Sequence, residues 1–308
     1  FSFEHEGRTC HVARGDAYEP DPRTGKWKFM LHLYDPDYRE KNYVERDGKI
    51  FRKPKDGRLI PVKREFAEGF EQATSVRDLI GLERGWTTFT LQSPKTPDVP
   101  AYNDLRNRIL REQADYVDNR VEPVTERAHS GRAALKTVSV ERSRGMQTAK
   151  ASLSTELMHF VKDDDVWFAA WYFVPEGSSL PTTWMDLETT WMHQHPGIRI
   201  MTTGGSHLSV ELKWVNKIVH RQTRGKEQAF PTGRWVHVRA HLKLSAKTDG
   251  VIEVWQDGRK IIDARGQTLL LPHTIYNSFE IGISAYSERQ GPCTLFVDDV
   301  QLSGRPLD

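Results

Sequence analysis

From Glu65 onward the chain consists of short apolar or alternating runs separated by turns, which is the pattern of β-strands. In RWVHVRAHLKLS, residues 234–245, the alternation is regular. One face of this segment carries polar and aromatic side chains, and the other carries Val, Ala and Leu. Similar runs are GWTTFTLQ, DVWFAAWYFVP, HLSVELKWV, VIEVWQDGRKII and SFEIGISAYS. Many short strands at this spacing predict an antiparallel, all-β sandwich or barrel.

Two segments depart from this strand pattern. Residues 101–117 have Leu105, Ile109 and Tyr116 roughly on one helical stripe, with Pro100 just before them, so we expect a short helical insertion there. Residues 1–63 are rich in charges, aromatics and turn residues, and their Asp-Gly pairs predict short hairpins. We expect this segment to be an N-terminal extension that packs on a body formed by residues 64–308.

Composition indicates a globular protein with a substantial core, since 37% of the 308 residues are hydrophobic and 28% are charged. Lys and Arg total 44 against 42 for Asp and Glu, and no basic arm or zinc-finger spacing occurs. Nucleic acid is therefore disfavoured as a partner. No run of 18 apolar residues exists, so we expect no membrane span. Cys10 and Cys293 lie near opposite ends of the chain, and both a disulfide and two free thiols stay open.

Three segments carry a resemblance to a known fold: EGFEQ at 68–72, AHSGRAALK at 128–136 and TLFVDDVQLS at 294–303. They resemble the first, second and last strands of carbohydrate-active β jelly rolls of the concanavalin A-like type. In such folds the first and last strands pair, and a calcium ion often lies at that edge. The resemblance implies a jelly roll over about residues 65–308 and a structural Ca²⁺ held by Glu71, Asp298 and Asp299. The alternative is that the two aspartates only charge an edge strand against aggregation.

A second resemblance concerns chemistry. If DLETTWMHQH continues as a strand, His193 and His195 share one face. The HQH stretch resembles the QIH strand of alginate lyases, and KASLSTEL at 150–157 is similar to their R-S/T-E-L strand. The resemblance implies His195 or His193 as the base, Gln194 or His193 as the group that neutralises a carboxylate, and Lys150 in place of an arginine.

Lyases of this kind cleave uronic acid polymers by removing the proton at C5 and expelling the 4-linked sugar, so they also need an acid. Their tyrosine-bearing strand is similar to SFEIGISAYS, in which Glu280 stands for a lysine and Ser284 for the tyrosine. Tyr286 lies on the same face of an ideal strand and is expected to be the acid. Further substrate-binding cations are expected at Arg199, Lys213, Arg239 and Lys243.

The leading hypothesis is a secreted or periplasmic polysaccharide lyase acting on an acidic glycan. A non-catalytic carbohydrate-binding module is the rival class, because the same fold and exposed aromatic side chains suffice for binding. A glycoside hydrolase comes third, since Asp186 and Glu188 lie on one strand face without a third carboxylate in the motif. Zinc held by His193 and His195 lacks further ligands at a suitable spacing.

Overall fold

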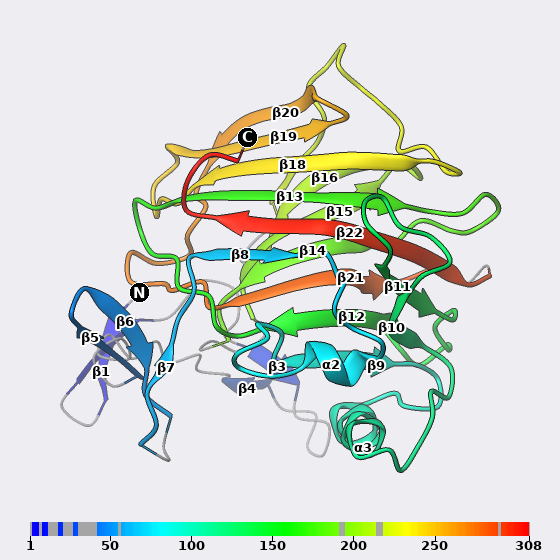
Figure 1. Cartoon of the computed structure of the whole chain (residues 1–308). Coiled ribbons are helices and arrows are strands. Elements are labelled where there is room, and N and C mark those ends of the chain that lie inside the picture. Colours follow the sequence, from blue (N-terminus) through cyan, green and yellow to red (C-terminus); the bar gives the residue numbers. More distant parts are fainter. Residues whose placement is uncertain are drawn as a thin grey trace.

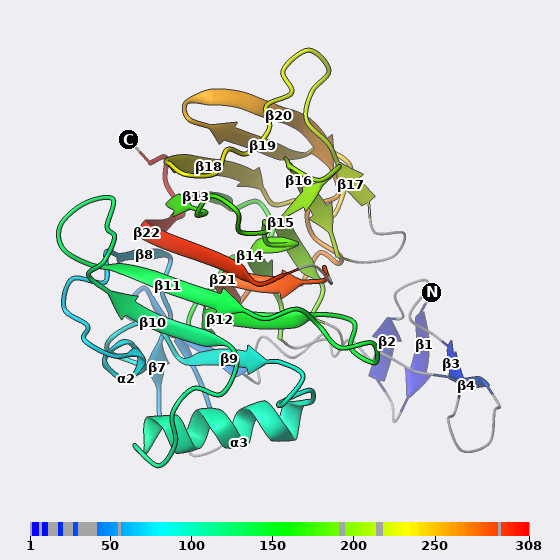
Figure 2. The same ribbon diagram turned by 90° about the vertical axis from the view of Figure 1, so that its right-hand side faces the viewer.

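The structure is a computed structural model, and it contains an antiparallel β-sandwich. It describes residues 2–5, 8–11, 18–20, 27–29, 42–54, 57–190, 195–213, 218–288 and 291–307. The two layers of the sandwich lie one behind the other in Figure 1 and are seen from the side in Figure 2. The strands at Trp235–Lys243 and Gly250–Gln256 alternate buried and half-buried side chains as the sequence pattern predicts, whereas the strand at Ser278–Tyr286 is buried along its whole length. Both layers consist of antiparallel strands, so the all-β prediction is confirmed.

The front layer is an eight-stranded sheet with the strand order β10-β11-β22-β13-β18-β19-β20 and β8 paired to β22. The predicted pairing of the first and last strands of the body is confirmed, although the first strand ends at Glu68 and EGFEQ is mostly a turn. The strands are β8 (Glu65–Glu68), β10 (Arg120–Val124), β11 (Ala134–Ser139), β13 (Asp165–Phe173), β18 (Trp235–Lys243), β19 (Gly250–Gln256), β20 (Arg259–Gly266) and β22 (Cys293–Ser303).

The back layer is a seven-stranded sheet with the order β17-β16-β15-β14-β21-β12-β9. Its neighbours are also antiparallel, and strands far apart in sequence, such as β14 and β21, lie side by side. The strands are β9 (Thr88–Gln92), β12 (Ala149–Thr155), β14 (Thr183–Glu188), β15 (Gly197–Thr203), β16 (His207–Leu212), β17 (Ile218–His220) and β21 (Ser278–Tyr286).

The core lies between the two sheets, and each sheet contributes the side chains of its inner face. Phe168 of β13 and Phe279 of β21 meet across this space with ring centroids 5.8 Å apart. Along β14 and β21, Leu187 and Ile281 point into the core and are fully buried. The neighbours of these two residues along each strand, among them Asp186, Glu188 and Glu280, therefore point to the outer face of the seven-stranded sheet. That outer face carries the polar groups that form the candidate site.

The helical insertion is shorter than the sequence pattern predicts. Helix α3 runs over Val99–Leu110, whereas 101–117 was expected, and a short helix α2 covers Val76–Leu79. The Asp98 side chain caps the first turn of α3, where Pro100 is tolerated. Glu112 then adopts a left-handed conformation with φ 60°, which ends the helix before Tyr116. Figure 2 shows α3 next to β9, at one edge of the seven-stranded sheet.

One of the predicted hairpins lies at the Asp47-Gly48 pair. Asp47 and Gly48 have φ 51° and 69°, and they join β5 (Tyr43–Arg46) to β6 (Lys49–Arg52), which pairs with β7 (Ile60–Pro61). The ring of Tyr43 is buried 4.8 Å from that of His159, so this part of residues 1–63 contacts the body. Near the N-terminus the backbone forms two further hairpins, β1 (Ser2–His5) with β2 (Arg8–His11) and β3 (Tyr18–Pro20) with β4 (Trp27–Phe29). The boundary at residue 63 stays a prediction.

Two smaller expectations can be compared with the described residues. Among them, no helix is both long and apolar enough to cross a membrane. Cys293 is a buried free thiol. Burial in the apolar core raises the pKa of this thiol well above its usual value, so it stays protonated.

Candidate active site

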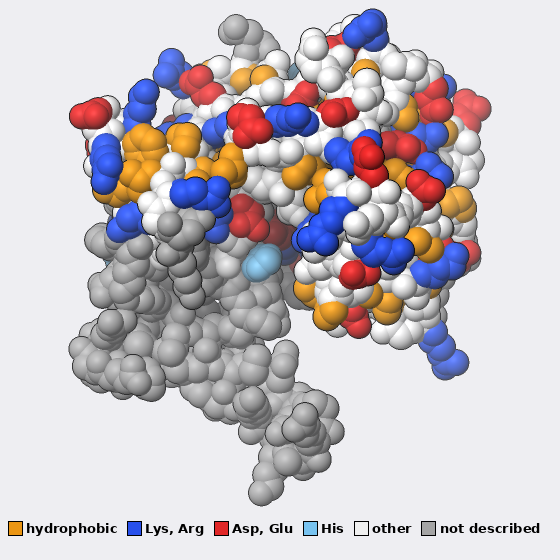
Figure 3. Space-filling view, turned by 60° about the horizontal axis from the view of Figure 1, so that its bottom comes forward, with side chains coloured by type: hydrophobic (Ala, Val, Ile, Leu, Met, Phe, Trp, Pro, Cys, Tyr) orange, Lys and Arg blue, Asp and Glu red, His pale blue; other side chains and the backbone are white. Residues whose placement is uncertain are grey.

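A cleft of about 890 Å³ lies on the outer face of the seven-stranded sheet, with α3 as one wall. Its floor is formed by β9, β12, β14 and β21, and its far side by His195 and Lys213. Figure 3 shows acidic side chains and a histidine in a hollow of this side of the molecule. The cleft is polar because each of these strands sends its alternate, non-core residues outward.

The strand register aligns charged residues in a row across the floor. Glu211 of β16 lies opposite Arg199 of β15, which lies opposite Asp186 of β14, which lies opposite Glu280 of β21. Both Asp186 and Glu280 are more than nine-tenths buried. Buried carboxylates need positive partners, because an isolated buried charge is strongly unfavourable.

The positive partners come from the same sheet face. The Lys213 ammonium contacts the carboxylates of Glu188 and of Asp186, the latter at 3.3 Å. Arg199 pairs with Glu211 through two of its guanidinium nitrogens. Lys150 lies 3.9 Å from a carboxylate oxygen of Glu280.

These pairs set the protonation states of the floor. Burial opposes the ionisation of Asp186, but the positive charges of Lys213 and Arg199 outweigh it and lower the pKa of that carboxyl. The Ser284 hydroxyl also donates a hydrogen bond to Asp186 at 2.5 Å. On the neighbouring strands, the negative charge of Glu280 raises the pKa of Lys150. Asp186 and Lys150 are therefore both charged at neutral pH.

His195 lies at the rim of the cleft, directly before β15. The predicted strand through HQH is wrong in this part, because β14 ends at Glu188 and His195 has a left-handed φ of 44°. Its side chain is 54% exposed, and its Nδ1 lies 3.8 Å from Oε2 of Glu188. A left-handed histidine is uncommon, and such backbone positions gather at functional sites.

Gly197 fixes the path of the chain beside His195. A Cβ atom at this position would lie 2.2 Å from the backbone oxygen of Leu187, so only glycine permits the close approach of β15 to β14. The glycine of the Pro-Gly pair that follows His195 is thus a backbone requirement, since it lets the start of β15 lie against the end of β14.

Helix α3 supplies the opposite wall. Tyr102, Asn103, Arg106 and Asn107 line the cleft, as expected for positions i, i+1, i+4 and i+5 of one helical face. Leu105 and Ile109, on the other face, are buried in the core. Burial raises the pKa of the Tyr102 phenol, so this hydroxyl is protonated at neutral pH.

Three of the residues predicted for catalysis or substrate binding line this cleft: His195, Lys150 and Lys213. Arg199 belongs to the same charged row, where Glu211 engages it. His193 and Gln194 lie outside the described residues.

Tyr286 does not line the cleft. Its side chain is fully buried, and its hydroxyl donates a hydrogen bond to the backbone oxygen of Gly291 at 2.7 Å. The expectation assumed an ideal strand, but β21 shifts register against both of its neighbours, and Gly282 has φ 98°. This irregularity breaks the alternation that would place Tyr286 beside Glu280.

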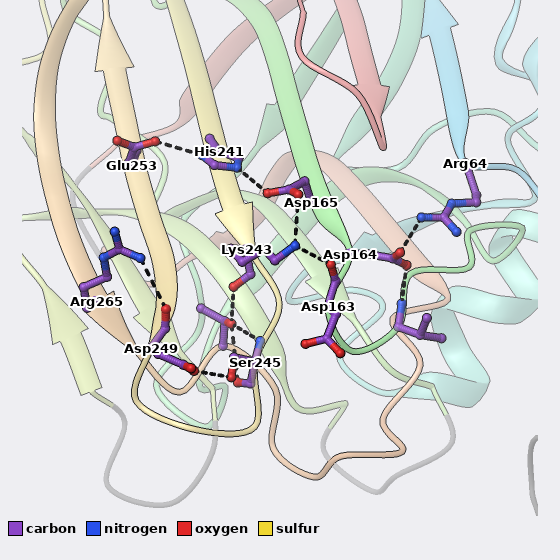
Figure 4. Close-up of polar contacts among 12 residues, drawn as sticks. Arg64, Asp163, Asp164, Asp165, His241, Lys243, Ser245, Asp249, Glu253 and Arg265 are labelled. Atoms are coloured by element: carbon purple, nitrogen blue, oxygen red, sulfur yellow. Dashed lines mark hydrogen bonds and ion pairs between the residues drawn. The ribbon is translucent and has the colours of Figure 1, made fainter.

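Arg239 and Lys243 lie on β18 of the other sheet, away from the cleft. Their strand has the predicted alternation, but its polar face is the outer face of the eight-stranded sheet. Figure 4 shows the Lys243 ammonium bonded to Asp165 and to the Asp163 carbonyl, at 3.1 and 2.5 Å. The Arg239 guanidinium lies over the ring of Trp255, 4.7 Å from its centroid. Both side chains thus have their partners on that sheet face.

The predicted calcium ligands lie where the first and last strands meet, and backbone amides surround them. Glu71 accepts hydrogen bonds from the backbone N–H groups of Arg132 and Ala133, at 2.9 and 3.2 Å. Asp298 accepts from two further amides of the same loop. Asp299 bonds to the side chain of His129 at 2.7 Å. Among the described residues no three His, Cys, Asp or Glu side chains are grouped as a metal site. Calcium binding here stays a prediction.

Sequence reasoning missed the residues of α3. Its polar face could be identified from the helical spacing of Tyr102 and Arg106 opposite Leu105 and Ile109. The position of the helix beside the cleft could not be identified from the sequence, because it depends on the order of strands β12 and β9 in the sheet.

The chain is similar to known proteins in sequence and in fold. Residues 81–301 match a family model described as "Polysaccharide lyase". The solved structure of "Cellulose induced protein, Cip1" is similar with a TM-score of 0.51 and 16% identity, over 79% of this chain and 98% of that chain. An endo-β-1,4-glucuronan lyase from the fungus Trichoderma reesei gives a TM-score of 0.49 and 13% identity, over 71% and 95%. Alginate lyase Aly36B is similar with a TM-score of 0.45 and 8% identity, over 80% of this chain and 99% of that chain. No curated protein sequence matches the chain.

Proposed function

Because this chain belongs to the polysaccharide lyase family, we propose that it cleaves a uronic acid-containing glycan by β-elimination in the cleft beside α3. In this reaction a base removes the proton at C5 of the uronate, and the electron pair forms the C4–C5 double bond. The C4–O bond breaks, and the leaving oxygen takes a proton from an acid. The observation that carries the proposal is that one cleft presents a histidine, a protonated tyrosine and several cations to the same space.

His195 is proposed as the base. Among the residues that the structure describes, it is the histidine that lines the cleft, and imidazole is the side chain whose ordinary pKa lies nearest to neutral pH. Glu188 lies beside its Nδ1 and favours the imidazolium that forms when the C5 proton is taken. His193 is the alternative base that the sequence offers, and the test below includes it.

Tyr102 is proposed as the acid in place of Tyr286. Its hydroxyl is protonated, it lines the cleft, and it lies on the α3 wall, across from the floor that holds Lys150 and Glu280. Tyr286, by contrast, would have to give up a buried hydrogen bond to reach a substrate.

The cleft contains both cations and carboxylates. Lys150 and Lys213 line it, and each is held by a protein carboxylate. Their charge is therefore partly offset, which distinguishes this cleft from a simple basic groove. A polymeric substrate also favours action outside the cytoplasm, so a secreted or periplasmic location is part of the proposal.

Hydrolysis is the second candidate, because the predicted carboxylate pair does lie in the cleft region. Asp186 and Glu188 point to the same face of β14, and Glu280 lies opposite Asp186. A general acid must carry a proton at working pH, however, and the lowered pKa of Asp186 keeps that carboxyl ionised. Elimination is the better supported reaction.

The test is incubation with alginate, glucuronan, ulvan and glycosaminoglycans while ultraviolet absorbance and reducing ends are followed. Elimination creates an unsaturated uronate that absorbs in the ultraviolet. We expect absorbance to rise with at least one of these glycans, and His195→Ala to abolish the rise while His193→Ala retains it. Reducing ends without absorbance would indicate hydrolysis. Retention on a glycan with neither signal would indicate a binding module.

A further inference from the structure

The cations of the cleft floor are already occupied by protein carboxylates. Lys213 is bound to Asp186 and Glu188, and Lys150 lies near Glu280. Arg199 is bound to Glu211. A substrate carboxylate that approached any of them would compete with a buried anion of the protein. Neutralising a uronate therefore calls for a positive group that has no such partner.

Arg106 of α3 is such a group. Its side chain lines the cleft and is half-buried, and one guanidinium nitrogen donates a hydrogen bond to the backbone oxygen of Phe89 at 3.4 Å. Within the described part of the chain, Arg106 forms no ion pair. The carboxylate of Glu156, which also lines the cleft, is 3.3 Å from Arg52 and is engaged by it.

Arg106 is a half-buried cation whose charge could be balanced by a bound carboxylate. Burial lowers the pKa of the Arg106 guanidinium, and the negative charge of Glu156 offsets this effect only in part. An incoming carboxylate would offset it further, and the planar guanidinium can bind both carboxylate oxygens at once. The Phe89 carbonyl holds one end of the group, so it is partly positioned before substrate arrives.

The helix also presents neutral partners next to this charge. Asn103 and Asn107 line the cleft from the same face of α3, and Tyr102 lies one turn before Arg106. Amide side chains both donate to and accept from sugar hydroxyls. This face can therefore contact a sugar ring around the carboxylate.

We propose that Arg106 binds a carboxylate of the glycan in the cleft, which makes α3 the element that selects uronates with a free carboxylate over neutral or esterified sugars. The inference rests on the proposed function and adds the residue that binds the carboxylate of the substrate. The polar face of α3 is then a substrate-binding wall, while the paired floor cations maintain the geometry of the sheet.

The test compares Arg106→Gln with Arg108→Gln on the same helix. Arg108 is a matched control, because its side chain is 52% exposed and 3.8 Å from Asp104, and it does not line the cleft. KM and kcat are measured on the glycan that wild type cleaves. Dissociation constants are measured by calorimetry on each uronate glycan of the panel and on its carboxyl-methylated form, with every protein in the His195→Ala background so that no turnover occurs.

We expect Arg106→Gln to weaken binding of the free-acid glycan roughly 10- to 100-fold, the range for a lost charged hydrogen bond. Arg106→Lys should give a smaller loss, because it keeps the charge and loses the planar fork. Arg108→Gln should match wild type, and the methylated glycan should bind wild type and Arg106→Gln equally. Circular dichroism and melting curves establish that each variant is folded.

An unchanged affinity of Arg106→Gln for the free acid, or an equal loss on the methylated glycan, overturns the inference. Neither result touches the proposed elimination, which fails instead if wild type forms no unsaturated product on any uronate glycan. In that case the calorimetric comparison still measures the contribution of Arg106 to binding.

Discussion

The hydroxyl of Tyr286 donates a hydrogen bond to the backbone oxygen of Gly291 at 2.7 Å, in a fully buried position. This bond connects the end of β21 to a residue shortly before the start of β22. A tyrosine held in this way has a structural role. Tyr102, on the α3 wall, is the tyrosine whose hydroxyl is available to a substrate in the cleft.

The two tyrosines should therefore respond oppositely to removal of the hydroxyl. Tyr286→Phe should lower the free energy of unfolding by about 1 kcal/mol, because one buried hydrogen bond is lost, and leave kcat unchanged. Tyr102→Phe should lower kcat ~100-fold, since a proton-transfer group is removed, and leave stability nearly unchanged. Urea unfolding and the absorbance assay measure the two quantities. If Tyr286→Phe loses turnover and Tyr102→Phe does not, the acid is Tyr286, as the sequence predicted.

His195→Ala should reduce kcat by ~100-fold or more. The melting temperature should stay near that of wild type, because the side chain is 54% exposed and packs little. His207→Ala is the control, since His207 is half-buried on β16 and does not line the cleft. Equal activity of both variants would remove His195 from the mechanism.

Asp186 should make stability depend on pH in the acid range. Its pKa is lowered on folding, so its contribution is present above the unfolded value of about 3.9 and is lost as the pH falls through the lower folded value. Asp186→Asn should cost roughly 1–3 kcal/mol near neutral pH, because Lys213 loses a charged partner. The difference from wild type should shrink below pH ~4.

The control for this measurement is Asp115→Asn, at an exposed aspartate away from the network. Its unfolding curves should follow those of wild type at every pH. A difference between wild type and Asp186→Asn that is constant from neutral pH into the acid range would show that the charge of Asp186 does not stabilise the fold.

Glu71→Gln should lower the melting temperature even when a chelator is present. The carboxylate of Glu71 accepts hydrogen bonds from two consecutive backbone amides, and a neutral amide replaces these charge-assisted bonds poorly. Glu83→Gln, at an exposed position, should have no effect. The calcium prediction is tested on the same samples. A melting temperature of wild type that rises with calcium, and does not rise for Glu71→Gln, would show an ion at this edge.

Local patterns in the sequence determined the elements whose causes are local. The alternation of RWVHVRAHLKLS corresponds to β18, in which every second residue is buried. Asp257 and Gly258 form the turn between β19 and β20, with φ 50° and 78°. The Asp257 carboxylate accepts a hydrogen bond from the backbone of His237, as expected of a turn residue rather than a catalyst. The all-β class followed because many such strands can bury their apolar faces only against one another. The jelly-roll type was implied by the resemblance of the segments at 68–72, 128–136 and 294–303.

Only the tertiary structure decided which polar faces share a site. A period of two tells which residues lie on one face of a strand, but the sheet that receives the strand is set by long-range pairing. Lys213 and Lys243 have similar surroundings in the sequence, yet β18 joins the eight-stranded sheet, whereas β16, which ends just before Lys213, joins the other. The same pairing places α3 beside the cleft and brings Asp186 opposite Glu280, almost a hundred residues away in the chain. The irregularity in β21 buries Tyr286, because one shift in register reverses the face of every residue beyond it.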